Sequence, residues 1–82
     1  MLLADQIRAY VNKEIIVPAR QRGITIVHVK AGNVHAALGL KNRMPAVCGA
    51  LDAAKFQDFA QVTVINRLGP LQGANAEWVF GL

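Results

Sequence analysis

The spacing of hydrophobic residues changes between a helical and a strand-like period along this chain, and that order constrains the fold more than any other feature of the sequence. The first hydrophobic residues recur at three- and four-residue steps and comprise Leu3, Ile7, Tyr10, Val11 and Ile15. This is the period of one helix face, so we predict a helix over residues 4–17. Pro18 leaves two alternatives for residues 18–22, which are a break or a short continuation that Gly23 closes.

Three segments carry the pattern of β-strands. Residues 24–29 are dense in β-branched side chains and follow a glycine, which predicts a first strand. Residues 61–67 and 76–82 each show strand-like alternation, and the second directs Trp78 and Phe80 to one side. The turn between them contains the strand-breaking residues Gly69, Pro70, Gly73 and Asn75. We therefore predict a β-hairpin at the C-terminal end of the sequence.

Two short helices are expected between the first strand and the hairpin. The Gly32-Asn33 pair can cap a helix over residues 33–38, which stops at Gly39. Pro45 suits the first position of a second helix over residues 45–55. The residues that this second helix directs inward are Val47, Cys48, Leu51 and Ala54.

A chain of 82 residues supports one domain, 1–82, because so little buried surface cannot be divided between two cores. We expect Phe56 and Phe59 to anchor this core after the second short helix. The inward positions of the segments give the predicted core, which consists of Ile7, Val11, Ile26, Leu38, Leu40, Val47, Leu51, Val64, Trp78 and Phe80. The fold class is therefore expected to be α+β.

The hydrophobic content predicts self-association. Hydrophobic residues make up 54% of the chain, and a core this small hides only part of them. We expect a twofold homodimer. Leu2 and Ile16 lie off the main stripe of the first helix, so this helix is the expected interface.

The charge balance favours a polyanionic partner. Nine Lys and Arg residues against five Asp and Glu residues give a net charge of +4. The basic residues are spread singly along the sequence, so only folding can gather them. Composition leaves two interpretations open, which are a binding face for nucleic acid and ordinary solubilising charge.

The residue types do not favour an enzyme, a metal site or a cofactor site. The chain has no serine for a Ser-His-Asp triad. His28 and His35 are seven residues apart, without a Cys or carboxylate close by at zinc-ligand spacing. His35 is either a phosphate contact or a bystander. Cys48 is the only cysteine, and we expect a small buried hydrophobic residue in a reducing compartment.

The sequence also predicts the location of the protein. Asp5 stands where a signal peptide would be apolar, and no apolar run reaches the roughly 18 residues of a membrane span. We expect a cytoplasmic protein that does not enter a membrane.

The order of helix, strand, two helices and hairpin resembles the winged helix-turn-helix family over nearly the whole chain. The resemblance is carried by residues 34–40, Val-His-Ala-Ala-Leu-Gly-Leu, and residues 45–51, Pro-Ala-Val-Cys-Gly-Ala-Leu. Gly39, Val47 and Leu51 match the family's turn glycine and the two apolar positions of its following helix. The interval from Gly39 to Val47 is about two residues longer than the usual motif. The resemblance implies the order α-β-α-α-β-β, with the C-terminal hairpin as the wing.

The resemblance implies duplex DNA as partner and transcription regulation as role. In this family the head of the helix after the turn enters the major groove, and the wing contacts the backbone or the minor groove. Arg43 and Asn42 suit base contacts, and Lys41 suits a phosphate. Arg67 is the cation of the predicted wing. The full set of expected DNA contacts is Lys30, Lys41, Asn42, Arg43, Arg67 and Gln72.

The face of the second short helix that points away from the core predicts limited base readout. It carries Ala46, Gly49, Asp52 and Ala53 and so has almost no long polar side chains. The same small residues also allow a protein surface to approach closely. A protein–protein interaction or dimerisation module of the same fold is therefore the alternative function.

Overall fold

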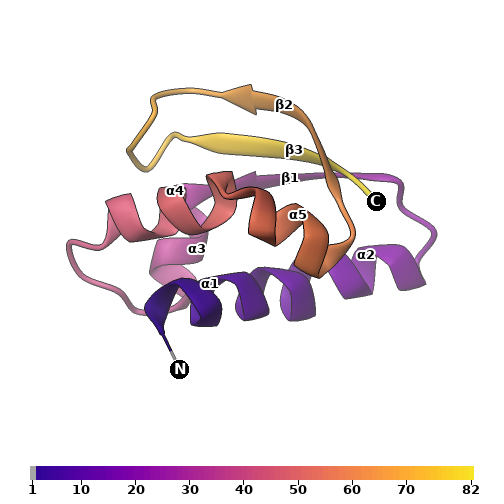
Figure 1. The fold of residues 1–82 in the computed structure, drawn as a ribbon, viewed down its shortest axis with the longest axis horizontal. Coiled ribbons are helices and arrows are strands. Elements are labelled where there is room, and N and C mark those ends of the chain that lie inside the picture. Colours follow the sequence, from indigo (N-terminus) through magenta and orange to yellow (C-terminus); the bar gives the residue numbers. More distant parts are fainter. Residues whose placement is uncertain (1) are drawn as a thin grey trace.

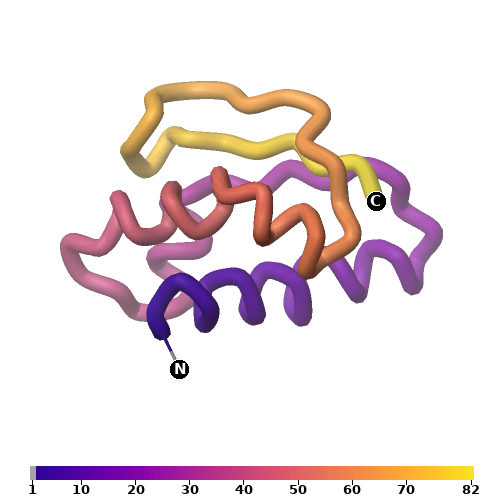
Figure 2. The backbone as a smooth tube through the Cα atoms, in the orientation of Figure 1, coloured from indigo at the N-terminus to yellow at the C-terminus, as the bar shows by residue number. Residues whose placement is uncertain are grey.

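The computed structural model describes residues 2–82 and has an α+β architecture. Figure 1 shows a three-stranded antiparallel sheet lying over a layer of helices, and Figure 2 shows the path of the backbone. The elements follow the predicted order of helix, strand, helices and hairpin. The sheet order is β1-β3-β2, so the last strand lies between the other two.

The first helical segment is longer than predicted. It consists of α1 (Leu3–Val11), a π-helical segment η1 (Asn12–Ile16) and α2 (Val17–Gln21), which follow one another without a break. Of the two alternatives for Pro18, the continuation is correct. Gly23 ends the run with a φ of 74° and donates its N–H to the carbonyl of Arg20.

The π-helical segment changes which residues of this helix face the core. Ile7 and Val11 are buried at the predicted four-residue spacing, but the next buried residue is Ile16, because the wider turn adds one residue. Ile15 is consequently only half-buried. The expectation that Ile16 is exposed for a dimer interface is therefore wrong, whereas Leu2 is exposed as expected.

The three strands are shorter than or shifted from the predicted segments. They are β1 (Ile26–Lys30), β2 (Thr63–Leu68) and β3 (Glu77–Gly81). Trp78 of β3 is paired with Val29 on one side and with Arg67 on the other. Alternation in β1 directs Val29 inward, so Ile26 points to the outer face of the sheet and is 50% exposed. Ile26 is therefore not a core residue, contrary to prediction.

The helix α3 (Ala31–Ala37) begins two residues earlier than predicted. The N–H groups of Ala31 and Gly32 donate to the carbonyls of Ala76 and Ala74, so backbone of the hairpin satisfies the start of the helix. Gly32 and Asn33 consequently lie within the helix and do not cap it. Gly39 follows the helix with a φ of 64°, as the predicted stop requires.

The segment predicted as one helix over residues 45–55 forms two helices instead. The helix α4 (Met44–Asp52) ends where Ala53 adopts an extended conformation with a ψ of 137°, and α5 (Ala54–Ala60) follows. The inward face of α5 carries Phe56 and Ala60. Phe59 lies beside that face and is 53% exposed, so only one of the two predicted anchors is in the core.

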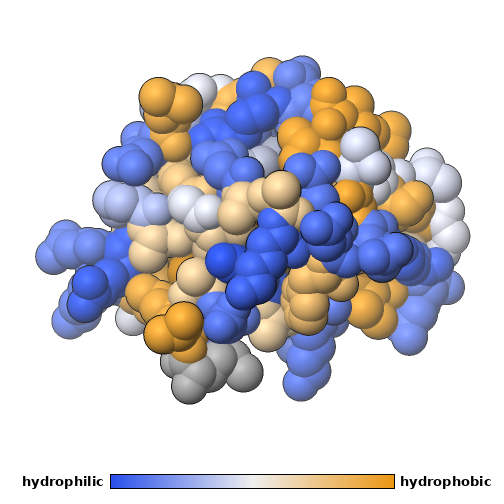
Figure 3. Space-filling view, in the orientation of Figure 1, coloured by the Kyte–Doolittle hydropathy of each residue, from blue (hydrophilic) through white to orange (hydrophobic). Residues whose placement is uncertain are grey.

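The core lies between the sheet and the helices. Of the predicted core residues, those that are buried are Ile7, Val11, Val47, Leu51, Trp78 and Phe80. Leu38, Leu40 and Val64 are partly buried and pack against this cluster. The rings of Phe56 and Phe80 pack at a tilt of 56° with their centroids 5.3 Å apart, which joins α5 to the sheet. The surface view of Figure 3 shows hydrophilic and hydrophobic residues interspersed on one face of the molecule.

Candidate functional site

The turn between α3 and α4 is held by backbone conformation and by one histidine. Asn42 has a φ of 54°, which is the left-handed conformation that asparagine adopts more readily than most residues. Arg43 precedes the first residue of α4, and its N–H donates to Nε2 of His35 over 3.2 Å. His35 therefore fastens the turn to α3 through an acceptor nitrogen. Neither sequence interpretation of His35 anticipated this, because the two residues meet only after the chain reverses.

Three of the predicted contact residues are exposed on this turn. Lys41, Asn42 and Arg43 all extend from the start of α4, and Lys30 is exposed at the start of α3. Within residues 2–82, no carboxylate forms an ion pair with Lys30, Lys41 or Arg43. Their charge is therefore available to an external anion.

The segment that contains these cations has no acidic residue. From Ile15 to Leu51 the chain carries no Asp or Glu, although it includes β1, α3, the turn and nearly all of α4. Nothing in this stretch can neutralise its cations locally. The absence of acidic residues over so long a stretch is visible in the sequence, and it is a stronger signal than the net charge.

The hairpin loop, residues 69–76, lies against the start of α3 and against α4. Hydrogen bonds from Ala31 and Gly32 reach its last residues, and Sγ of Cys48 on α4 lies 4.0 Å from the carbonyl of Gly73. Figure 1 shows the α3–α4 turn and the hairpin loop at the same end of the molecule. Gln72 is exposed in this loop, as is its neighbour Leu71, which is 86% exposed.

Arg67 does not extend from the hairpin as a free cation. Its Nε and Nη2 donate to the two carboxylate oxygens of Asp52 over 2.8 and 3.2 Å. The remaining N–H groups donate to the backbone carbonyls of Leu68, Pro70 and Leu71. A guanidinium has five N–H donors, and all five are used inside the molecule. Arg67 therefore has none left for a phosphate, which removes the physical basis for expecting a DNA contact there.

Asp52 joins Arg67 to the central strand. Its Oδ1 also accepts the indole N–H of Trp78 over 2.7 Å. Partial burial raises the pKa of the Asp52 carboxyl, but hydrogen bonds from Arg67 and Trp78 outweigh burial and hold that pKa below its ordinary value. The hydrogen bonds that Arg67 donates to Asp52 raise the pKa of Arg67. We call Asp52, Arg67 and Trp78 the hairpin clasp, because they fasten the hairpin to the end of α4.

The outward surface of α4 is nearly bare. Gly49 is exposed with no other atom near the position of a Cβ, and Ala46 is half-buried. Asp52 is exposed, but its carboxylate is engaged by the hairpin clasp. The surface available for base-specific hydrogen bonds is thus confined to the turn before the helix.

Other chemical groups in the structure are engaged locally. Nδ1 of His28 lies 2.7 Å from Oε2 of Glu77 across the sheet, and Cys48 is buried. Within residues 2–82, no three side chains of His, Cys, Asp or Glu lie close enough together to hold a metal ion. None of the helices over the same residues has the length and apolar character needed to cross a membrane.

Comparison with known proteins gives no match, because no family model fits the chain and neither the curated proteins nor the solved structures include a significant relative.

Proposed function

We propose that this chain is a winged helix-turn-helix protein that binds duplex DNA with limited base readout. The observation that carries the proposal is the set of unpaired cations at the start of α4, within a stretch that has no acidic residue. The element order and the sheet order β1-β3-β2 are compatible with this fold, in which the hairpin loop is the wing. A positive surface of this kind attracts the phosphate backbone whatever the base sequence.

The roles follow from position and chemistry. Arg43 and Asn42 head α4, where an arginine can contact guanine through two hydrogen bonds and an asparagine can contact adenine. Lys41 and Lys30 serve phosphates, and Gln72 reaches the backbone from the wing. The remaining length of α4 offers few side chains for base edges, so most of the affinity comes from backbone contacts.

Arg67 has a positioning role in this proposal. It orders the wing through backbone carbonyls and fixes it to α4 through Asp52. The wing and the N-terminal end of α4 then keep a fixed relative orientation. This lowers the entropic cost of binding, because both elements contact the same duplex.

The test is a mobility-shift titration with a mixed-sequence duplex at two salt concentrations. Binding should weaken steeply as salt increases, and Lys41→Ala should lower the slope of log affinity against log salt by about one unit. Lys13→Ala is the matched control, because Lys13 is exposed on η1, remote in sequence from the turn, and its loss removes the same charge. Equal slopes for both variants and the unmutated chain would contradict the proposal.

The alternative is a protein-interaction module of the same fold. It is favoured by the bare surface at Gly49 and Ala46, which lets another protein backbone come close. A chain that binds no duplex at low salt, with its fold intact, would support this alternative.

A further inference from the structure

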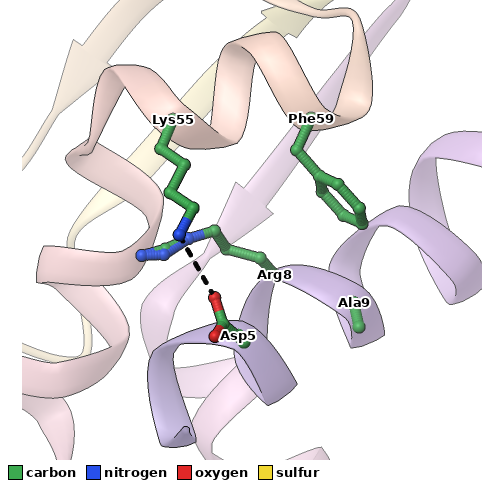
Figure 4. A pocket seen from close by; sticks show the side chains of 5 residues that line it. All are labelled: Asp5, Arg8, Ala9, Lys55 and Phe59. Carbon is green, nitrogen blue, oxygen red and sulfur yellow. Dashed lines mark ion pairs between the residues drawn. The ribbon is translucent and has the colours of Figure 1, made fainter. Parts of the chain in front are cut away.

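A groove between α1 and α5 has features that the proposed DNA contacts do not use. Figure 4 shows Asp5, Arg8 and Ala9 on α1 facing Lys55 and Phe59 on α5. These five residues line a hollow of about 300 Å³. We call it the α1–α5 groove. Its α5 residues follow the C-terminal end of α4, whereas Lys41 and Arg43 of the DNA proposal precede the N-terminal end of α4.

In the charged half of the groove, Arg8 has donors without acceptors. Nε and Nη1 of Arg8 are buried and have no hydrogen-bond partner within residues 2–82. Buried donors without acceptors are costly, and the cost disappears when an acceptor is supplied. The nearest carboxylate in the groove, Asp5, pairs with Lys55 at 3.7 Å and does not satisfy Arg8. The groove therefore has two cations and one carboxylate.

The other half of the groove is apolar. Phe59 is 53% exposed although its ring faces the hollow, and Ala9 forms the opposite wall. A half-exposed phenylalanine beside a hollow offers an apolar surface to a partner. The volume lies at the lower end of the range for small-molecule sites, so it suits one or two side chains of a protein segment.

We propose that the α1–α5 groove docks an acidic protein segment in which a carboxylate lies next to an apolar side chain. The carboxylate accepts hydrogen bonds from Arg8 after a small rotation of its guanidinium, and Lys55 lies within the same positive region. The apolar side chain packs on Phe59 and Ala9.

Two other occupants fit the groove less well. In a twofold contact between copies, each copy would bring two cations and one carboxylate of the groove to the same interface, so an excess of positive charge would remain there. A nucleic-acid backbone would bring its phosphates towards Asp5 and would leave the ring of Phe59 without an apolar partner. An acidic protein segment can place one carboxylate at Arg8 and an apolar side chain on Phe59, which a nucleic-acid backbone cannot do.

The test uses two peptides with blocked ends, one with Leu between two Glu residues and one with Gln in place of Glu. Each is titrated into the isotopically labelled chain while backbone amide and arginine Nε–H signals are followed by NMR. The Glu peptide should shift the Arg8 Nε–H signal and the amides of residues 5–9 and 55–59. The Gln peptide should bind about tenfold more weakly, since it lacks the charge that strengthens the hydrogen bonds.

Variants separate the groove from general charge attraction. Arg8→Met keeps the aliphatic length and should weaken the Glu peptide about tenfold, whereas Lys13→Met on the same helical run should not change it. Phe59→Ser, at an exposed position, should weaken both peptides alike. Equal affinities for the Glu and Gln peptides, or shifts centred on residues 41–43, would overturn the proposal.

Two further measurements would show whether the groove binds DNA or a second copy of the chain instead. Loss of duplex affinity and of salt slope in Arg8→Met, to the extent expected for Lys41→Ala, would make the groove part of the DNA surface. If the unmutated chain self-associates in sedimentation and the Arg8→Met variant does not, the groove binds a second copy of the chain. Either result would overturn the docking proposal without affecting the DNA proposal through Lys41.

Discussion

The guanidinium of Arg67 lies over the indole of Trp78, with Cζ 4.6 Å from the ring centroid, and both side chains donate to the carboxylate of Asp52. A cation over an indole face is attracted by the ring's electron density. The contact joins three elements, because Arg67 is on β2, Trp78 is on β3 and Asp52 ends α4. The hairpin therefore cannot change its angle to α4 without breaking this cluster.

The hairpin clasp should make stability depend on pH. The pKa of Asp52 lies below its ordinary value in the folded chain, so the folded state binds its proton less readily than the unfolded state. The stabilisation is fully present above the ordinary Asp pKa and is lost as pH falls through the lowered folded value. Urea unfolding followed by the fluorescence of Trp78, the only tryptophan, should show this loss.

Asp52→Asn provides the matching variant for this prediction. The amide keeps one acceptor oxygen but loses the charge, so the variant should be less stable at neutral pH and should lose less stability on acidification. Asp58→Asn is the control, because Asp58 is exposed and is in no ion pair within residues 2–82. The same acid-induced loss in Asp52→Asn as in the unmutated chain would assign the pH dependence to another group.

Leu51 should be among the most sensitive core positions. It is fully buried on α4, and Leu51→Ala should lower the free energy of unfolding by about 2 to 5 kcal/mol, since a cavity remains. Leu71→Ala, at the exposed hairpin loop, should change it by less than about 0.5 kcal/mol. Similar urea midpoints for the two variants would mean that Leu51 does not face the core.

Sequence periodicity predicted the helices and the sheet but not two changes of phase. The four-residue spacing from Ile7 to Val11 continues to Ile15 in the sequence, but the π-helical turn places Ile16 inward instead. The extended conformation of Ala53 likewise starts a new inward face, which takes Phe56 and leaves Phe59 outside. Both changes are local departures from regular α-helical conformation, which the periodicity of hydrophobic residues does not describe.

The candidate site was predictable in its local part only. Lys41, Asn42 and Arg43 are consecutive, so the sequence indicated that they form one exposed basic turn. Arg67 was different, because its carboxylate partner Asp52 is fifteen residues away and meets it only in the folded chain. A cation in a turn region looks the same in sequence whether it is free or engaged.

Substitutions of Gly69 and Gly23 should separate the energetic cost of a steric clash from the cost of a positive φ. Gly69 has a φ of 78°, and a Cβ there would collide with the carbonyl of Asn75 across the hairpin loop. Gly23 has a φ of 74°, but a Cβ there would meet no other atom. Gly23→Ala should cost about 1 kcal/mol from backbone strain alone, and Gly69→Ala should cost more and disorder the loop. Thermal unfolding measures the loss of stability in each variant. Equal losses for Gly23→Ala and Gly69→Ala would contradict the steric argument.

Self-association remains a prediction, but the structure indicates a different interface from the one expected on the first helix. With Ile16 buried, the apolar side chains that remain exposed include two on the outer face of the sheet, Ile26 and Ile65, which are 50% and 56% exposed. We expect a twofold dimer through this face, and Ile26→Lys should produce a monomer in sedimentation. Leu71→Lys, on the hairpin loop, should not. A monomer for the unmutated chain at concentrations on the order of tens of micromolar would remove this prediction.

Arg43 should contribute to base readout, and His35 should act only by holding Arg43 in place. If Arg43 contacts a base, Arg43→Ala should lose about 1 to 3 kcal/mol of binding free energy on a selected preferred duplex and much less on random DNA. His35→Ala removes the acceptor for the Arg43 N–H, so the turn loosens while its cations remain. That variant should lose preference between the two duplexes but keep the salt slope of the unmutated chain, because the number of phosphate contacts is unchanged. Duplex titrations of both variants at two salt concentrations measure preference and slope together. An unchanged preference in Arg43→Ala would confine this residue to phosphate contact, and a lowered salt slope in His35→Ala would mean that the histidine itself contacts the backbone.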